Sequence, residues 1–200
     1  MYPRERYGNT PDSVIFRFGI YPYKMKILQS WLQVGAIFDL IETEQIKTFI
    51  EVGVYEGGFG SLVSAKSFYD KEFRYFGIEI DSSVVNIDFI DQCRKAGNLI
   101  FFGDVFDNFT LMRKIISESK GPVLLFCDGG DKVKEMKTFY SFMRIGDIIM
   151  CHDYMPELTP AIGSVLDTDI EFLTFNDNFD EVSGYRWKYR MPAFRCIAKQ

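Results

Sequence analysis

The chain has 200 residues and a net charge of −5, with 47% hydrophobic and 26% charged residues. This length suits a single domain, and the composition is that of an ordinary globular protein. The acidic balance argues against general nucleic-acid binding, which needs a basic surface. No apolar run approaches membrane-spanning length, so no membrane partner is expected.

The start of the chain and its cysteines indicate a compartment. The first nine residues are polar and charged, unlike an apolar signal sequence. None of the four cysteines forms a CxxC pair. We therefore expect reduced thiols in a cytoplasmic protein. The sequence leaves homo-oligomerisation open.

The predicted elements begin after an irregular stretch over residues 1–22. Apolar residues at near-helical spacing predict a helix over residues 23–43. Short apolar runs then alternate with helical patterns. The predicted strands cover residues 48–52, 74–80, 98–102, 123–127, 146–151, 170–175 and 193–198. The predicted helices cover residues 59–68, 82–95, 108–118 and 131–144.

This alternation predicts an α/β fold with a doubly wound, mostly parallel sheet. The last two strands are expected to form a closing antiparallel pair. We assign the chain to one domain, residues 1–200. It comprises an N-terminal arm and helix over residues 1–45 and a Rossmann-like core over residues 46–200.

The helix predicted over residues 131–144 has an amphipathic pattern. Its inner stripe comprises Val133, Met136, Phe139, Tyr140 and Met143, whereas Lys134, Glu135 and Lys137 are expected to face away from the core.

A glycine-rich turn, Glu51-Val-Gly-Val-Tyr-Glu-Gly-Gly58, follows the first strand of the core. Glycine allows a positive φ and a close approach to a ligand, so we expect the space beside Gly57 to be taken by a ligand. The spacing differs from the G-x-G-x-x-G of dinucleotide sites. Glu51 would repel a pyrophosphate but suits a cofactor with a cationic amino group.

Acidic residues also end the next two predicted strands. Glu79 closes the second strand, where a carboxylate can accept hydrogen bonds from both ribose hydroxyls. Asp104 closes the third strand, where an adenine amino group would lie. Each could be a solvated loop acid, but an acid at three successive strand ends favours a nucleoside-containing cofactor.

These motifs resemble the motif series of class I S-adenosylmethionine-dependent methyltransferases over about residues 45–155. The resemblance implies a seven-stranded sheet with an antiparallel last strand. It places Glu51 near the methionine amino group, Glu79 on the ribose and Asp104 near the adenine. The predicted cofactor-binding residues are Glu51, Gly53, Tyr55, Gly57, Gly58, Glu79, Ile80, Asp104, Val105 and Asp128.

Two further predicted strands end in Asp128 and in the pair His152-Asp153. Neighbouring parallel strands lie about 4.8 Å apart, so these three side chains can converge on a divalent-metal site, with Mg or Mn as candidates. This half resembles metal-dependent O-methyltransferases, including the catechol-type, macrolide-sugar and cephalosporin hydroxylase-like proteins. His152 departs from that pattern, which usually has an acid or amide there. As the only histidine, it has an alternative structural role.

The predicted catalytic residues are Asp131 and Lys132, of which Asp131 is the preferred proton acceptor. Sugar-modifying members of the branch carry a general-base histidine where this chain has Asp131. Two structural alternatives stay open. Asp131 can simply cap the following helix, and Lys132 can act as an internal counter-ion for Asp128 and Asp153.

The sequence thus predicts an S-adenosylmethionine-dependent methyltransferase that transfers a methyl group to a hydroxyl of a small molecule or sugar, with a divalent metal as a candidate second cofactor. One alternative is a protein of the same fold that binds the cofactor and does other chemistry, or none. Another is a Rossmann-type nucleotide or dinucleotide enzyme. A nucleic-acid methyltransferase is a third.

Overall fold

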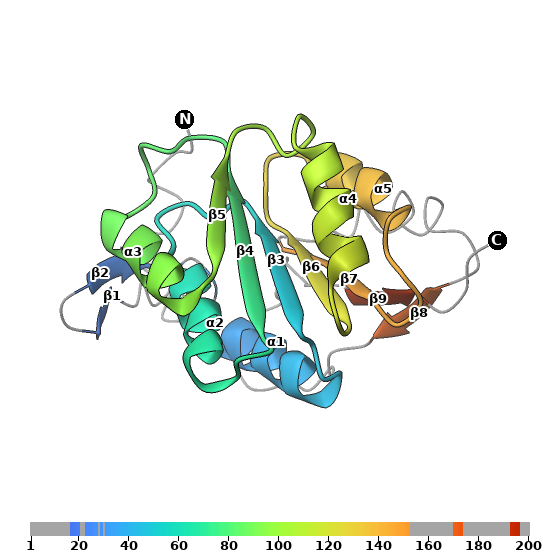
Figure 1. Cartoon of the computed structure of the whole chain (residues 1–200), viewed down its shortest axis with the longest axis horizontal. Helices are drawn as coiled ribbons and strands as arrows, with labels where there is room; N and C mark the ends of the chain where they lie inside the picture. The colour runs from blue at the N-terminus through green and yellow to red at the C-terminus, as the bar shows by residue number, and fades with distance from the viewer. Residues whose placement is uncertain are drawn as a thin grey trace, which may run out of the picture.

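A seven-stranded sheet forms the centre of the described structure, with the order β5-β4-β3-β6-β7-β9-β8 (Figure 1). This computed structural model describes residues 17–20, 23–27, 29, 31–152, 170–173 and 193–196. The strands are β3 (Thr48–Val52), β4 (Arg74–Glu79), β5 (Leu99–Phe102), β6 (Val123–Cys127), β7 (Ile148–Cys151), β8 (Ile170–Leu173) and β9 (Ala193–Cys196). β9 pairs antiparallel with β7 and β8, and the other pairs are parallel. The predicted sheet is confirmed.

The strand order reverses between β3 and β6. β3 pairs with β4 on one side and with β6 on the other, and both β3 and β6 are buried along their whole length. Strands covered on both faces have no polar alternation, which explains the continuous apolar run of β6, whereas β3 also buries Thr48 and Glu51. In such sheets ligands bind outside the carboxyl ends of the strands at the reversal point.

Helices cover both faces of the sheet, giving three layers (Figure 1). On one face lie α1 (Trp31–Thr43), α2 (Gly58–Tyr69) and α3 (Ile87–Ala96). On the other lie α4 (Phe109–Glu118) and α5 (Lys132–Tyr140). No helix in the described part of the chain is long and apolar enough to cross a membrane.

The helix predicted over residues 23–43 is wrong in its first part. β1 (Arg17–Ile20) and β2 (Tyr23–Lys26) form a separate antiparallel pair, and α1 begins only at Trp31. Met25 and Ile27 are both buried, and residues two apart share one face of a strand. The near-helical spacing of the apolar residues therefore did not reveal that a strand period gives way to a helical period before α1.

The boundaries of α3 and α5 also differ from the prediction. The helix predicted from residue 82 begins only at Ile87, where the side chain of Asn86 caps α3 by accepting a hydrogen bond from the Asp88 amide at 2.8 Å. Gly97 ends α3 in the left-handed conformation. The helix predicted to residue 144 ends at Tyr140.

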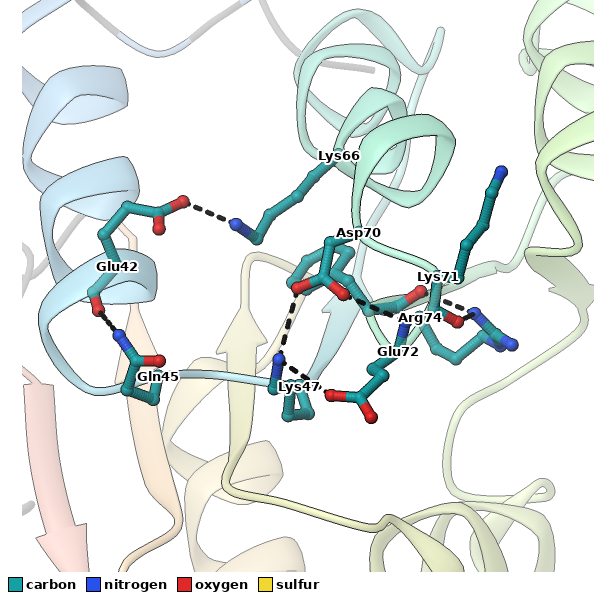
Figure 2. A network of polar contacts seen from close by, with 9 residues as sticks. Glu42, Gln45, Lys47, Lys66, Asp70, Lys71, Glu72 and Arg74 are labelled. Carbon is teal, nitrogen blue, oxygen red and sulfur yellow. Dashed lines mark hydrogen bonds and ion pairs between the residues drawn. The ribbon is translucent and has the colours of Figure 1, made fainter.

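Ion pairs hold the end of the sheet opposite the glycine turn (Figure 2). Lys47, which precedes β3, lies 3.3 Å from Asp70 and 3.2 Å from Glu72. Lys66 of α2 reaches Glu42 of α1 at 2.5 Å. Exposed pairs of this kind contribute only about 0–1 kcal/mol each. We therefore infer that these ion pairs join α1 and α2 to the starts of the strands. Functional residues are expected at the other end of the sheet, at the carboxyl ends of the strands.

Candidate functional site

The carboxyl ends of five parallel strands are aligned in one row. The backbone ladder continues one residue past the strands, with N···O distances of 2.9–3.1 Å. The donating amides belong to Gly53, Gly103, Asp128 and His152, and the accepting carbonyls to Ile78, Glu79, Val52 and Cys127. This alignment brings the predicted site residues to one edge of the sheet.

The glycine turn between β3 and α2 has the strained backbone that its sequence predicts. Gly53, Tyr55 and Gly57 have φ values of 87°, 54° and 89°. A Cβ on Gly53 would lie 2.8 Å from the carbonyl carbon of Asp128, so only glycine lets the turns after β3 and β6 approach each other. Gly58 is the buried first residue of α2.

Gly57 has a different role from the predicted one. A Cβ at this position would overlap the ring of Phe89 on α3. The space beside Gly57 is therefore filled by the protein's own core, and the expectation that a ligand occupies it is wrong. A valine at position 57 would disturb α2–α3 packing before it met any cofactor.

Glu51 is a buried acid at the end of β3, with 1% of its surface exposed. The hydroxyl of Tyr75 on β4 donates to its Oε2. Burial raises the pKa of Glu51 well above its ordinary value, and the Tyr75 hydrogen bond opposes that rise. The charges of Glu79, Asp128 and His152 also influence this pKa, so these residues share one electrostatic environment.

Glu79 joins two turns at the end of β4. Its Oε2 accepts a hydrogen bond from the Tyr55 amide at 2.7 Å, and its Oε1 accepts one from the Asp81 amide at 3.2 Å. Tyr55 and Ile80 beside it are exposed large side chains, as a surface for a flat ligand would require. Each carboxylate oxygen keeps a second acceptor position.

Asp104 follows β5 in a turn of its own. Its Oδ1 accepts a hydrogen bond from the Phe106 amide at 2.8 Å, and its carbonyl accepts one from the Asn108 side chain at 2.8 Å. Val105 is 7% exposed and packs into the core beneath α4 and α5. Of these two predicted cofactor contacts, only Asp104 is partly open to a ligand.

Asp128 at the end of β6 is surrounded by polar partners. Its Oδ2 accepts a hydrogen bond from Gln29 at 2.8 Å. Its Oδ1 lies 3.1 Å from His152 Nδ1 and 3.7 Å from Lys132 Nζ. The side chains of Asp128, His152 and Lys132 are all at least 85% buried, so their charges are weakly screened.

The predicted metal set is only partly described, because Asp153 lies outside the described residues. Within the described residues no group of three His, Cys, Asp or Glu side chains could hold a metal ion. His152 Nδ1 is engaged with Asp128, and His152 Nε2 faces Gln33 Oε1 at 3.5 Å. Lys132 already supplies a positive charge beside Asp128. The described contacts favour Lys132 as the counter-ion of Asp128, and the metal site stays a prediction.

Asp131 occupies the N-cap of α5. Its Oδ1 accepts a hydrogen bond from the Lys134 amide at 3.0 Å, and the residue is exposed. Asp131 therefore has the helix-capping role that the sequence left open as the alternative to catalysis. Lys132 donates to the Gly129 carbonyl at 2.9 Å. Whether either residue accepts a proton stays a prediction.

Replacing Asp131 with asparagine tests that prediction. If Asp131 is the proton acceptor, Asp131→Asn should lower the rate of methyl transfer at least tenfold with nearly unchanged cofactor affinity, because Asn caps helices as well as Asp does. Asp131→Ala is the matched control and should cost about 1 kcal/mol of stability through the lost cap. Full activity of the asparagine variant would leave Asp131 only its capping role.

Glu135 corrects the predicted orientation of α5. It was expected to face away, but it is 1% exposed. Its Oε1 lies against Gly129, where a Cβ would come within 2.3 Å of it. Burial raises its pKa to about 7, against the effects of Lys132 and of backbone hydrogen bonds from Gly129 and Asp131.

Sequence reasoning missed three other polar residues near the site: Gln29, Gln33 and Tyr75. Gln29 precedes α1 and is 6% exposed, yet no motif marks it. Its contact with Asp128 joins positions 99 residues apart. Its burial appears only in the structure, where Asp128 is the partner that a buried polar group needs.

Two cysteines lie directly before the site residues at the ends of β6 and β7. Cys127 and Cys151 are buried and pack into the core on the α4–α5 face, away from Asp128 and His152. Each side chain points opposite to the site residue that follows it, as strand alternation requires. None of the four cysteines forms a disulfide bond.

Comparison with known proteins finds solved structures that share the fold. No family model matches the chain, and a search of curated proteins gave no match. Among solved structures, the chain is similar to apo CmcI, with a TM-score of 0.66 and 18% identity over 100% of this chain and 86% of that one. A complex described as CmcI with Mg and SAM gives 0.65 and 17% over 99% and 86%.

A third similar structure is the O-methyltransferase TomG from Streptomyces achromogenes, involved in tomaymycin synthesis, in complex with SAM. Its TM-score is 0.58, with 12% identity over 86% of this chain and 82% of that one. At such identities the likeness concerns the fold. The chain has the Rossmann-like fold of S-adenosylmethionine-dependent O-methyltransferases.

Proposed function

We propose that this protein is an S-adenosylmethionine-dependent methyltransferase that acts on a hydroxyl group of a small molecule. The observation that carries the proposal is the row of acids at the ends of β3, β4 and β5, beside a glycine turn with positive φ angles. That row lies at the strand-order reversal of a fold shared with O-methyltransferases.

The residues present fit such a cofactor. Glu51 would face the ammonium group of its amino-acid end, and Glu79 would accept hydrogen bonds from the ribose hydroxyls with the acceptor positions left by Tyr55 and Asp81. Asp104 would accept from the adenine amino group. The bound cofactor supplies an electrophilic methyl group.

The protein's contribution to the reaction is mainly positioning, since methyl transfer is an in-line displacement. Backbone amides hold the carboxylates of Glu79 and Asp104, and the Tyr75 hydroxyl holds that of Glu51, so little reorganisation is needed on binding. Asp131 or Lys132, at the start of α5, would accept the proton of the acceptor hydroxyl. Both lie in the turn that follows Asp128.

Calorimetric titration with S-adenosylmethionine and with NAD tests the proposal. We expect binding of the first and none of the second, because the buried Glu51 would repel a pyrophosphate. NAD binding without S-adenosylmethionine binding would favour the dinucleotide alternative and end the proposal.

A second candidate function is cofactor binding without methyl transfer. The cap formed by Asp131 favours it, because the preferred proton acceptor already has a structural role. Incubating the protein and cofactor with catechols, sugars and other small hydroxyl compounds, and measuring S-adenosylhomocysteine, separates the two candidates. Binding with no product from any acceptor would favour the second.

Metal assistance is a separate part of the proposal, and Lys132 provides its test. If Lys132 is the counter-ion of Asp128, Mg²⁺ or Mn²⁺ should leave the melting temperature unchanged, and Lys132→Met should destabilise the protein by about 3–5 kcal/mol, the usual cost of breaking a buried pair. A metal site predicts the opposite: the ions raise the melting temperature of the wild type, and Asp128→Asn removes that response.

A further inference from the structure

Tyr75 and Glu51 form a buried polar pair at the base of the glycine turn. Tyr75 is fully buried on β4, and its hydroxyl donates to Glu51 Oε2 on the neighbouring strand β3. Both side chains lie on the sheet face covered by α2 and α3. The pair is the sole hydrogen bond of the Glu51 carboxyl within the described residues.

The surrounding residues fix this pair in place. A Cβ on Gly60 of α2 would lie 2.8 Å from Glu51 Oε2 and closer still to the Tyr75 hydroxyl. The Phe89 ring packs edge-on against the Tyr75 ring with a centroid distance of 5.8 Å. Glycine at position 60 therefore makes room for the hydroxyl, and Phe89 prevents the tyrosine ring from turning away.

The second oxygen of Glu51, Oε1, has no hydrogen bond within the described residues. A carboxylate can accept about four hydrogen bonds in all, so it retains capacity for a ligand. We propose that Tyr75 is a positioning residue, which holds Glu51 so that this oxygen meets the ammonium group of a bound amino-acid moiety. The inference rests on the proposed function, because that moiety is the methionine end of the cofactor.

This role makes binding depend on pH. The charged or titratable groups around Glu51 are Glu79, Asp128, His152 and, on α3, Cys93. Burial raises the Glu51 pKa, and the Tyr75 hydroxyl lowers it. The ammonium group requires an ionised Glu51, so affinity should rise as pH passes through that pKa. Without the hydroxyl the rise should occur at higher pH.

The experiment measures affinity by calorimetry between about pH 5 and 9 for the wild type and for Tyr75→Phe. Two ligands are used: S-adenosylmethionine, and adenosine, which lacks the amino-acid moiety. For S-adenosylmethionine we expect about tenfold weaker binding by Tyr75→Phe near pH 7, since a hydrogen bond to a charged group is lost. The profile should move to higher pH, and adenosine affinity should be equal for both proteins.

Two more variants keep the test decisive. Glu51→Gln should bind S-adenosylmethionine weakly at every pH with a flat profile. Gly60→Ala should move the profile in the same direction as Tyr75→Phe, because its methyl group pushes the Tyr75 hydroxyl and Glu51 Oε2 apart, and it decides the matter if Tyr75→Phe fails to fold.

The inference is overturned if the variants keep the wild-type profile, or if they lose adenosine and S-adenosylmethionine affinity equally, as general damage would cause. If the wild type binds neither ligand, the proposed function itself fails. That result differs from the first two, in which the wild type binds.

Discussion

Replacing Glu79 with alanine should weaken the binding of S-adenosylmethionine at least tenfold. The carboxylate would accept two ribose hydrogen bonds, and a hydrogen bond to a charged group contributes about 1.5–3 kcal/mol. Glu79 also accepts hydrogen bonds from the amides of Tyr55 and Asp81, so its removal should loosen both turns beside the proposed cofactor site. Calorimetry gives the affinity, and a melting curve shows that the domain is still folded.

Glu79→Gln is the matched control for this change. Glutamine keeps one acceptor oxygen and the length of the side chain, so it can still bind one turn amide but loses the charge and one acceptor. Its affinity should lie between those of the wild type and the alanine variant. An affinity of Glu79→Ala equal to the wild-type value would remove Glu79 from the cofactor site.

Replacing Glu135 with glutamine should stabilise the protein at alkaline pH. The pKa of Glu135 is about 7 in the folded protein, above the ordinary value of 4.5. The folded state therefore holds the proton more tightly than the unfolded chain, and stability is lost as pH rises through the interval between these values. A shift of this size corresponds to about 3 kcal/mol.

Glutamine cannot ionise, so the stability of Glu135→Gln relative to the wild type should be small near pH 5 and approach about 3 kcal/mol near pH 8.5. One acidic oxygen, Oε2, is buried without a hydrogen-bond partner in the described structure, which explains why ionisation is costly. Urea unfolding at the two pH values measures the difference. Glu118→Gln, an exposed acid at the end of α4, removes the same charge and should show no such pH dependence.

A difference between Glu135→Gln and the wild type that does not change with pH would contradict this explanation. It would mean that Glu135 is ionised throughout, held by Lys132 and the two backbone hydrogen bonds. The same variant then probes the turn after β6, because Glu135 lies against Gly129 beside Asp128.

The sheet was predictable because its signals are local. β6 is a continuous apolar run, β3 is mostly apolar and is followed by Gly53, and alternation with helices implies parallel pairing. The start of α1 was not predictable, because Met25 of β2 lies at near-helical spacing from the apolar residues that follow it in the sequence. The α3 boundary was missed because Asn86 is one of several capping residues in a row.

The candidate site was likewise predictable in part from the sequence and in part only from the tertiary structure. The sequence by itself determined that acids and glycines follow successive strands, and parallel strands must bring such residues to one edge. Only the tertiary structure decided the partners of each acid. Tyr75, 24 residues from Glu51, supplies its hydrogen bond, and Gln29, 99 residues from Asp128, supplies another.

The tertiary structure also corrected two predictions that were made from the spacing of residues in the sequence. Gly57 makes room for Phe89 instead of a ligand, and Glu135 turns inward because the Gly129 turn supplies hydrogen bonds that a helical pattern does not record. The physical reason is common to both cases. Periodicity reports which face of an element is apolar, whereas the cost of burying a polar group depends on partners that the fold brings from distant parts of the chain.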